Sequence, residues 1–196
     1  MTIVDIYDFD GTIYRGDSTV DFIRFLLGKR KLLALSLLAC VPDAVRLLFD
    51  KNLTTFKSSL FSRLSEHVDL NAEGRAFWET TAAQDKINEW IRQRKRDVPT
   101  IIASASPDFE LKWIARQLDA DLICTNCDPK TGMVIGVNCK SSEKVRKIRE
   151  KYGEVSVRAM YTDNISADRP LLELAEEQYR VDPKTGAVSR IQISAT

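Results

Sequence analysis

Apolar positions along this chain follow two different spacings. Residues 3–7, Ile-Val-Asp-Ile-Tyr, form a short run of mainly β-branched and aromatic side chains, which predicts a buried strand. From about residue 16 to residue 96 no similar run occurs, and apolar residues recur instead every three or four positions. Examples of this helical spacing are Val20, Ile23 and Leu27, followed by Phe56, Leu60 and Leu64. The first half of the chain therefore predicts one strand followed by a long helical segment.

Strands and helices alternate after Pro99. The predicted strands are residues 100–103, 121–125 and 155–161, and each is followed by residues with helical spacing. The helices are expected to begin at Ser106-Pro107, as N-cap and first helical position, to run from about Ser141 to Tyr152, and to include 171–175. Strands that are separated by helices predict crossover connections and a parallel sheet covered on both faces.

The string Asp-Pro-Lys-Thr-Gly occurs at 128–132 and again at 182–186. Pro followed by Gly is typical of turns, so both copies are expected at hairpin tips. The predicted fold is an α/β core, residues 1–15 and 97–196, with a small β-hairpin and a helical insertion at residues 16–96. Because ligands bind at the carboxyl ends of parallel strands, this insertion is placed to act as a cap over that rim.

Composition and charge narrow the range of functions. The 196 residues carry 29 basic and 28 acidic side chains, so no overall charge favours nucleic acid as a partner. The single histidine, His67, excludes a multi-histidine metal site and is expected to end a helix without a catalytic role. Cys124 and Cys127 have no second Cys or His pair beside them, so buried thiols in a reducing cytoplasm are expected. The amino-terminal residues do not have the pattern of a secretion signal, which also favours a cytoplasmic location.

Acidic residues follow two of the predicted strands. Asp8 and Asp10 come directly after the first strand, and Asp163 and Asp168 follow the strand at 155–161. The carboxyl ends of parallel strands meet at one rim, where these acids would repel one another unless a cation lay between them. Oxygen ligands in a chain with one histidine favour Mg²⁺.

The same rim would hold other groups that phosphoryl transfer uses. Ser104 and Ser106 follow the strand at 100–103, and Lys144 lies near the start of the helix that precedes the strand at 155–161. A carboxylate can attack phosphorus, and a second acid two residues on can protonate the leaving oxygen. A hydroxyl and an ammonium can bind the phosphoryl oxygens as charge develops on them. The set as a whole predicts phosphoryl transfer.

These segments resemble the four motifs of the haloacid dehalogenase superfamily. The matching segments are Asp8-Phe9-Asp10-Gly11-Thr12, then Thr100-Ile101-Ile102-Ala103-Ser104, then Lys144 with Val145 and Ile148, and last Asp163 with Asp168. The motifs span the α/β core in the family's order. The resemblance implies a Rossmann-like core with a helical cap inserted after the first motif, as in the phosphoserine phosphatase-like subgroup.

The resemblance also implies the role of each motif residue. Asp8 would be the nucleophile and a Mg²⁺ ligand, and Asp10 the general acid/base and a ligand through its backbone carbonyl. Ser104 and Lys144 would hold the transferring phosphoryl group. Further phosphate contacts would come from Gly11, Thr12 and Ala105.

The fourth motif departs from the family pattern. Asp163 would complete the Mg²⁺ site, with Asp168 as a further ligand or as its neighbour. Thr162 stands where the family often has Gly, and Asp168 comes five residues after Asp163 rather than the commoner four. Lys140 is a competitor for the role of Lys144, although Lys144 fits the third motif better.

Two segments of the predicted cap give different indications about the substrate. Residues 56–64 resemble the phosphoserine phosphatase segment that binds the substrate carboxylate, which would make Arg63 a substrate residue, and Asp17 falls where those enzymes bind the substrate amine. The Gly-Gly pair of those enzymes is absent after Ser104, where this chain has Ala105-Ser106-Pro107.

The second indication is the apolar run at 32–41, which has basic residues on both sides. It is similar to the cap of phosphatidylglycerophosphatase C enzymes. A run of this length is too short to cross a bilayer but suits a peripheral membrane contact through residues 29–49. A cap helix buried against its neighbours, or a contact between two copies, explains the run equally simply.

The leading hypothesis is a Mg²⁺-dependent phosphomonoester hydrolase that acts on a small phosphorylated metabolite or on a phospholipid headgroup. It would be cytoplasmic, or peripheral at the inner face of the membrane. One alternative is a phosphate-binding or membrane-surface protein with little catalysis. The other is a phosphotransferase with an acceptor other than water. Because the nucleophile, the acid and both phosphate-binding groups are present, nothing in the sequence indicates an inactive site. The phosphotransferase differs from the hydrolase only in the acceptor that enters the site, which the motifs do not show.

Overall fold

One mixed sheet lies at the centre of the computed structural model, which describes residues 2–30, 33–38, 40–42, 44 and 52–193. Its strand order is β3-β2-β1-β4-β5-β6, and all neighbours are parallel except the antiparallel pair β5 and β6. The strands are Thr2–Tyr7 (β1), Thr100–Pro107 (β2), Asp121–Thr125 (β3), Val155–Thr162 (β4), Ala175–Val181 (β5) and Val188–Ile191 (β6). The predicted α/β fold is confirmed.

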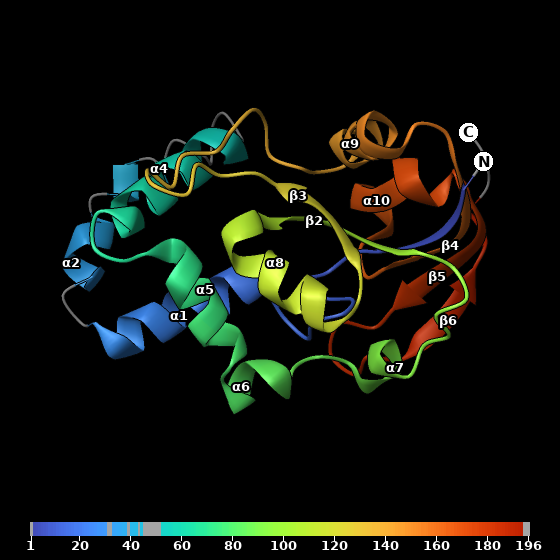
Figure 1. Cartoon of the computed structure of the whole chain (residues 1–196), viewed down its shortest axis with the longest axis horizontal. Coiled ribbons are helices and arrows are strands. Elements are labelled where there is room, and N and C mark those ends of the chain that lie inside the picture. The colour runs from blue at the N-terminus through green and yellow to red at the C-terminus, as the bar shows by residue number, and fades with distance from the viewer. Residues whose placement is uncertain (1, 31–32, 39, 43, 45–51, 194–196) are drawn as a thin grey trace.

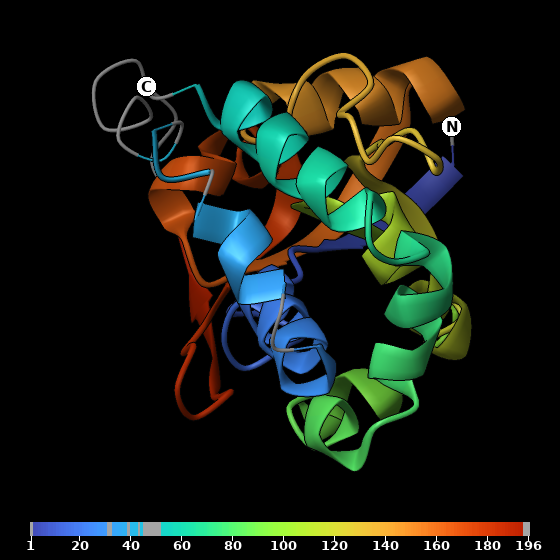
Figure 2. The same cartoon turned by 90° about the vertical axis from the view of Figure 1, so that its left-hand side faces the viewer.

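Among the described residues the chain between β1 and β2 forms helices and the turns that connect them, but no strand of the sheet. Figure 1 shows the earlier of these helices on the left of the sheet and the last one on the right. They are α1 (Ser18–Lys29), α2 (Leu33–Leu38), α4 (Leu53–Ser65), α5 (Leu70–Trp78), α6 (Thr81–Gln84) and α7 (Glu89–Arg92). The later helices are α8 (Asp108–Gln117), α9 (Ser142–Tyr152) and α10 (Ile165–Leu172). The end-on view of Figure 2 shows that α1, α2, α4 and α5 lie at one end of the molecule.

The sheet buries a separate apolar cluster on each face, because successive side chains of a strand point to opposite faces. Ile6 and Ile101 belong to the cluster that α9 and α10 cover. Tyr7 and Ile102 belong to the other cluster, which α8 and the inserted helices cover. The inserted helices therefore share one continuous core with the sheet, including the fully buried Trp78 of α5.

Two details differ from the sequence-based expectation. Ser106 does not cap α8: it belongs to β2, and Pro107 occupies the N-cap position with no side-chain capping bond. Helix α10 ends at Leu172, so the helix expected across 171–175 is too long, and Ala175 instead begins β5. The sequence of β5 is Ala-Glu-Glu-Gln-Tyr-Arg-Val. Because the strand is only partly buried, most of its residues are polar, and it was not recognised as a strand from the sequence.

Both copies of Asp-Pro-Lys-Thr-Gly form turns at hairpin tips, as predicted. In each copy the Asp side chain accepts hydrogen bonds from the amides two and three residues later, and the Gly has a positive φ. Each turn also packs against the insertion. A Cβ on Gly132 would lie 2.2 Å from the carbonyl oxygen of Phe61 in α4, and one on Gly186 would lie 2.2 Å from Oδ1 of Asn88.

The hairpin that follows β3 is bonded to α4 along its length. The amide of Asn138 donates to Oγ1 of Thr54 at 3.0 Å, and the amide of Val134 donates to Oγ of Ser58 at 3.1 Å. Together with the close approach of Gly132 to α4, these bonds join the hairpin to the insertion.

The segment expected to contact a membrane, residues 29–49, lies partly outside the described residues. Where it is described, Leu38 and Val41 are exposed, whereas Leu33 and Cys40 are buried. No helix in the described ranges has both the length and the apolar character needed to cross a membrane.

Candidate active site

Asp8 lies at the carboxyl end of β1 and contacts the buried ammonium of Lys144. The amide of Asp8 donates to the carbonyl of Tyr161 in β4 at 2.9 Å, which fixes the backbone at the sheet rim. Nζ of Lys144, in the first turn of α9, lies 2.7 Å from Oδ1 of Asp8 and 2.7 Å from Oδ1 of Asp168. Lys144 is therefore the lysine that meets the predicted nucleophile, while its competitor Lys140 is exposed.

Burial and charge act on this group in opposite directions. Burial raises the pKa of the Asp8 carboxyl to about 7, although the Lys144 ammonium opposes the shift. Burial acts to lower the pKa of Lys144, but the carboxylates of Asp8 and Asp168 outweigh it and raise that pKa. Lys144 thus stays an ammonium, and its charge favours the ionised form of Asp8.

Asp168 has protein partners on both carboxylate oxygens. Oδ1 accepts a hydrogen bond from Lys144, and Oδ2 accepts one from the hydroxyl of Thr162 at 2.7 Å. The same Thr162 oxygen accepts from the amide of Asn164 at 3.0 Å. Thr162, which departs from the family pattern, therefore fixes the Asp168 carboxylate in the orientation in which it accepts from Lys144.

Asp163 lies against the turn that carries Asp10 and Gly11. Its amide donates to Oγ1 of Thr12 at 2.8 Å, and Thr12 itself is fully buried. Gly11 has a φ of +75°, and a Cβ there would lie 2.3 Å from Oδ2 of Asp163. Only glycine fits at this position, because both the backbone conformation and the carboxylate exclude a side chain.

The backbone amides of Gly11 and Thr12 bind other partners than the sequence led us to expect. The amides of Gly11 and Thr12 were expected to bind phosphate, but Gly11 donates to the carbonyls of Tyr14 and Gly16, and Thr12 donates to the carbonyl of Phe9. The tight turn uses these donors itself. Within the described part of the chain the amides of Phe9 and Asp10 have no acceptor, so they are the free donors next to Asp8.

The Asp10 carboxylate is held by two donors. Oδ1 accepts from the amide of Ser18 at 2.6 Å, and Oδ2 accepts from the hydroxyl of Ser106 at 2.5 Å. The amide of Ser106 in turn donates to Oγ of Ser104 at 3.0 Å. Burial raises the pKa of Asp10, so this carboxyl keeps its proton to a higher pH than an exposed aspartate does.

Sequence reasoning did not find Glu110 and Thr19, which lie behind Asp10. Oγ1 of Thr19 is 3.1 Å from Oγ of Ser106 and 3.0 Å from Oε2 of Glu110. Glu110 is completely buried in the first turn of α8, and burial raises its pKa to about 8. The helix N-terminus favours the ionised form by only about 0.3–1 kcal/mol, which is too little to offset that burial. An acidic residue in the first turn of a helix is usually solvated, so no signal in the sequence marked it.

The inserted helices contribute Lys57 to the carboxyl end of β2, next to Ser104. Its ammonium donates to the carbonyl of Ala105 at 2.7 Å and to Oδ1 of Asn138 at 2.9 Å. Burial lowers the pKa of Lys57, while the charges of Asp10 and other nearby acids act against the shift. The Ala105 carbonyl that Lys57 binds also accepts from the hydroxyl of Thr125, so α4 is bonded to the carboxyl end of β2.

The two residues predicted to bind the substrate's charged groups have other surroundings. Arg63 is six residues after Lys57 on α4, about 9 Å farther along the helix axis. Its Nε is buried and has no hydrogen-bond partner among the described residues. Asp17 caps α1 by accepting from the amide of Val20 at 2.9 Å. Their roles in substrate binding stay predictions.

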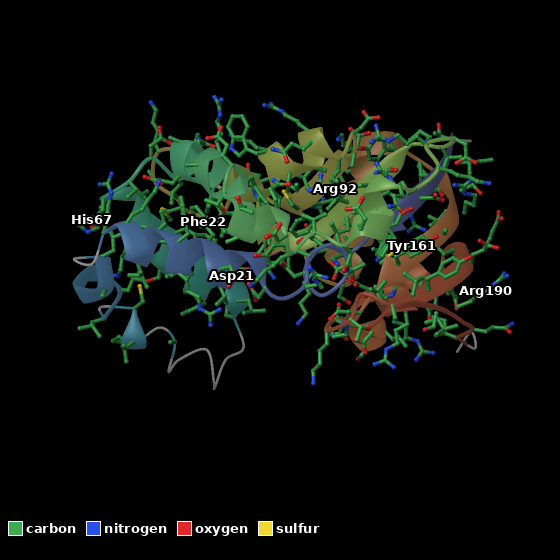
Figure 3. The ribbon with its side chains drawn as sticks, turned by 90° about the horizontal axis from the view of Figure 1, so that it is seen from below. Asp21, Phe22, His67, Arg92, Tyr161 and Arg190 are labelled. Atoms are coloured by element: carbon green, nitrogen blue, oxygen red, sulfur yellow. The ribbon has the colours of Figure 1, made fainter. Side chains whose placement is uncertain are left out.

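The remaining candidates lie away from the rim or carry no reactive arrangement. Figure 3 places His67 at the far end of the inserted helices, opposite Tyr161 of β4. Cys124, Cys127 and Cys139 are free and buried, and burial raises the pKa of each thiol. In the described ranges no three His, Cys, Asp or Glu side chains converge closely enough to hold a metal by themselves.

Comparison with known proteins shows that the residues of this site lie within a segment that matches one protein family. A model of the haloacid dehalogenase-like hydrolases matches residues 6–173. Protein CicA of Caulobacter vibrioides is 30% identical over 190 residues, covering 89% of this chain and 84% of that protein.

Two solved structures share the fold. A protein of unknown function from Bordetella pertussis Tohama I has a TM-score of 0.75 at 18% identity, covering 95% of this chain and 92% of that one. A phosphoserine phosphohydrolase-like protein from Francisella tularensis has a TM-score of 0.53 at 18% identity, covering 91% and 86%. At these identities the likeness concerns the fold alone.

Proposed function

Because the chain belongs to the haloacid dehalogenase-like hydrolases, we propose that it hydrolyses a phosphate monoester through a phosphorylated Asp8. The observation that carries the proposal is the placement of Asp8 at the rim of the sheet. One of its oxygens is bound to the Lys144 ammonium, and the free amides of Phe9 and Asp10 lie beside it. A carboxylate with adjacent cationic and amide donors suits attack on a phosphoryl group.

In the first step an Asp8 oxygen bonds to phosphorus while the bond from phosphorus to the ester oxygen breaks. The bonding electrons leave with that oxygen, and the Asp10 carboxyl gives it a proton, so an alcohol departs. Lys144, Ser104 and the two free amides bind the phosphoryl oxygens as negative charge builds on them. In the second step Asp10 takes a proton from water as the water oxygen bonds to phosphorus. Asp8 leaves as a carboxylate, and Asp10 has regained its proton.

The residues of the site fit Mg²⁺, which takes few protein ligands and keeps several waters. Asp8, Asp163 and the backbone carbonyl of Asp10 would hold it, with Asp163 lying against the turn that carries Gly11. When bound, the ion would neutralise charge on the phosphoryl oxygens and orient them. We assign Asp168 to the orientation of Lys144, because protein donors occupy both of its carboxylate oxygens.

We place the division between catalytic core and cap at residues 1–15 and 97–196 against residues 16–96. The contact of Lys57 with Ala105 supports this, since it brings a residue of the cap to the carboxyl end of β2, beside Ser104. The proposed substrate is a small phosphorylated metabolite or a phospholipid headgroup, and contact of residues 29–49 with a membrane remains part of the second option. Four free, buried cysteines support a reducing, cytoplasmic location.

Replacement of Asp8 with Asn tests the mechanism, because the amide has the same shape and cannot form the acyl phosphate. Hydrolysis of p-nitrophenyl phosphate in excess Mg²⁺ should disappear, and chelation of the ion should abolish hydrolysis by the unchanged protein. Thermal unfolding of the variant serves as the control for folding. Hydrolysis at the original rate by folded Asp8→Asn protein would rule out the proposed nucleophile. Phosphate binding without turnover by the unchanged protein would instead favour a binding protein.

A further inference from the structure

A buried chain of polar side chains extends from Asp10 into the core, away from the phosphate-binding groups. It runs from the Asp10 carboxylate through the hydroxyls of Ser106 and Thr19 to the Glu110 carboxyl. The successive oxygen–oxygen distances are 2.5, 3.1 and 3.0 Å. Ser106 and Glu110 are buried and Thr19 is half-buried, so water contributes little to this chain. The inserted helix α1 supplies Thr19, and the core supplies the other residues.

Counting protons determines the state of the chain. The three contacts are hydrogen bonds only if three protons lie between the oxygens, and the two hydroxyls supply two of them. A carboxyl group at one end must supply the third. If Glu110 supplies it, Glu110 donates to Thr19, Thr19 donates to Ser106, and Ser106 donates to Asp10. All the protons then point toward Asp10.

The surroundings of Glu110 favour a neutral carboxyl. Its Oε1 makes no hydrogen bond among the described residues, and such an oxygen is much more costly to bury as part of a carboxylate. The Ser18 hydroxyl, which also makes no hydrogen bond there, acts to lower the pKa of Glu110, but burial has the larger effect. The charged groups that act on Glu110 are the acids Asp10 and Asp17 and the Lys57 ammonium of α4. Burial outweighs the attraction of Lys57, so the pKa of Glu110 is raised.

We propose that Thr19 and Glu110 are positioning residues that act through Ser106 to fix the Asp10 carboxyl toward the leaving oxygen of the substrate. The inference deepens the proposed function and rests on it. The Glu110 carboxyl donates a hydrogen bond to Thr19, which leaves the Thr19 hydroxyl to donate to Ser106. The Ser106 hydroxyl then donates to Oδ2 of Asp10. The Ser18 amide holds the other oxygen, so the plane of the carboxyl is fixed.

The test uses Thr19→Val, which removes the hydroxyl and keeps the shape, and Thr19→Ser, which keeps the hydroxyl. Each is assayed with phenyl phosphate and with p-nitrophenyl phosphate. The two esters are similar in size, but phenol is a much weaker acid and depends more on a proton from Asp10. We measure kcat/KM, which covers the steps up to the phosphorylated Asp8.

The Val variant should lose at least about ten-fold in kcat/KM for phenyl phosphate and much less for p-nitrophenyl phosphate. The Ser variant should restore both values. Equal losses for the two esters, or no restoration by Ser, would overturn the positioning role. If the unchanged protein hydrolyses neither ester, the proposed function fails and the inference fails with it.

Glu110→Gln and Glu110→Leu test the end of the chain. The Gln amide can donate to Thr19 as a neutral carboxyl does, so kcat/KM should stay within about three-fold of the original value. Leu has no donor, so it should reproduce the dependence on leaving group seen with Thr19→Val. If Gln and Leu cause the same loss while both proteins remain folded, Glu110 does not act as a neutral donor and the assignment is wrong.

Discussion

Replacement of Glu110 with Gln should make the free energy of unfolding less dependent on pH. The folded protein holds this carboxyl, which is completely buried, at a pKa of about 8 against an ordinary value of 4.5. Between these values the unfolded chain has lost the proton while the folded protein keeps it. The folded state then binds more protons, so the free energy of unfolding falls as pH rises. Below the lower value both states are protonated, and Glu110 contributes no dependence.

The slope can reach about 1.4 kcal/mol per pH unit for one group. From about pH 5 to about pH 8, Glu110 should therefore lower the free energy of unfolding by about 2–4 kcal/mol. Gln does not titrate and removes this contribution. All other groups are unchanged, so the difference between the two proteins isolates Glu110.

The assay is urea unfolding at several values between these pH limits, followed by the fluorescence of tryptophan. Trp78 is a suitable probe, because its Nε1 donates to the carbonyl of Glu110 at 2.8 Å. The exposed Glu154 provides the matched control, and Glu154→Gln should leave the slope unchanged. If the original protein and Glu110→Gln have parallel curves over the whole range, the carboxyl is not held neutral and the reasoning is refuted.

Two further predictions concern the contacts between the insertion and the core. Gly132→Ala should lower the free energy of unfolding by about 1–3 kcal/mol more than Gly136→Ala does. Both glycines have a positive φ, but only Gly132 faces a backbone carbonyl. Equal losses in urea unfolding would contradict the contact between Gly132 and α4. Lys57→Met should lower kcat/KM about ten-fold or more, because the carboxyl end of β2 around Ser104 loses its bond to α4. Lys130→Met, in an exposed turn, should leave kcat/KM unchanged. An unchanged kcat/KM for Lys57→Met would show that α4 does not position the carboxyl end of β2.

The sequence was sufficient to predict that Asp8 and Asp163 lie at the ends of strands, because both follow runs of apolar residues. Ser104 was expected after the strand at 100–103, but it lies within β2, near the carboxyl end of that strand. Parallel strands bring their carboxyl ends to one rim, so chain order alone places these residues together. The side chain of Lys144 could be matched to a motif, but its ion pair with Asp168 depends on how α9 and α10 pack.

Residues that act from helices were harder to predict. Glu110 and Lys57 are charged residues at positions that would ordinarily be solvated, and only tertiary packing turns them toward the site. Ser106 was assigned to the wrong partner, because Ser before Pro is typical of a helix start. In the structure β2 continues through Ser106, which aims its hydroxyl at Asp10 instead.

The bonds between α4 and the hairpin after β3 determine which parts of the chain can move as one body. By chain order this hairpin belongs to the sheet, but its contacts join residues 132–138 to the cap. Any movement that lifts α4 from the rim must therefore carry this hairpin with it or break those bonds. The moving body is then assembled from two stretches of chain that lie far apart in sequence. A covalent crosslink between α4 and the hairpin would still allow α4 to move away from the rim of the sheet. A crosslink between α4 and β2 would prevent this movement.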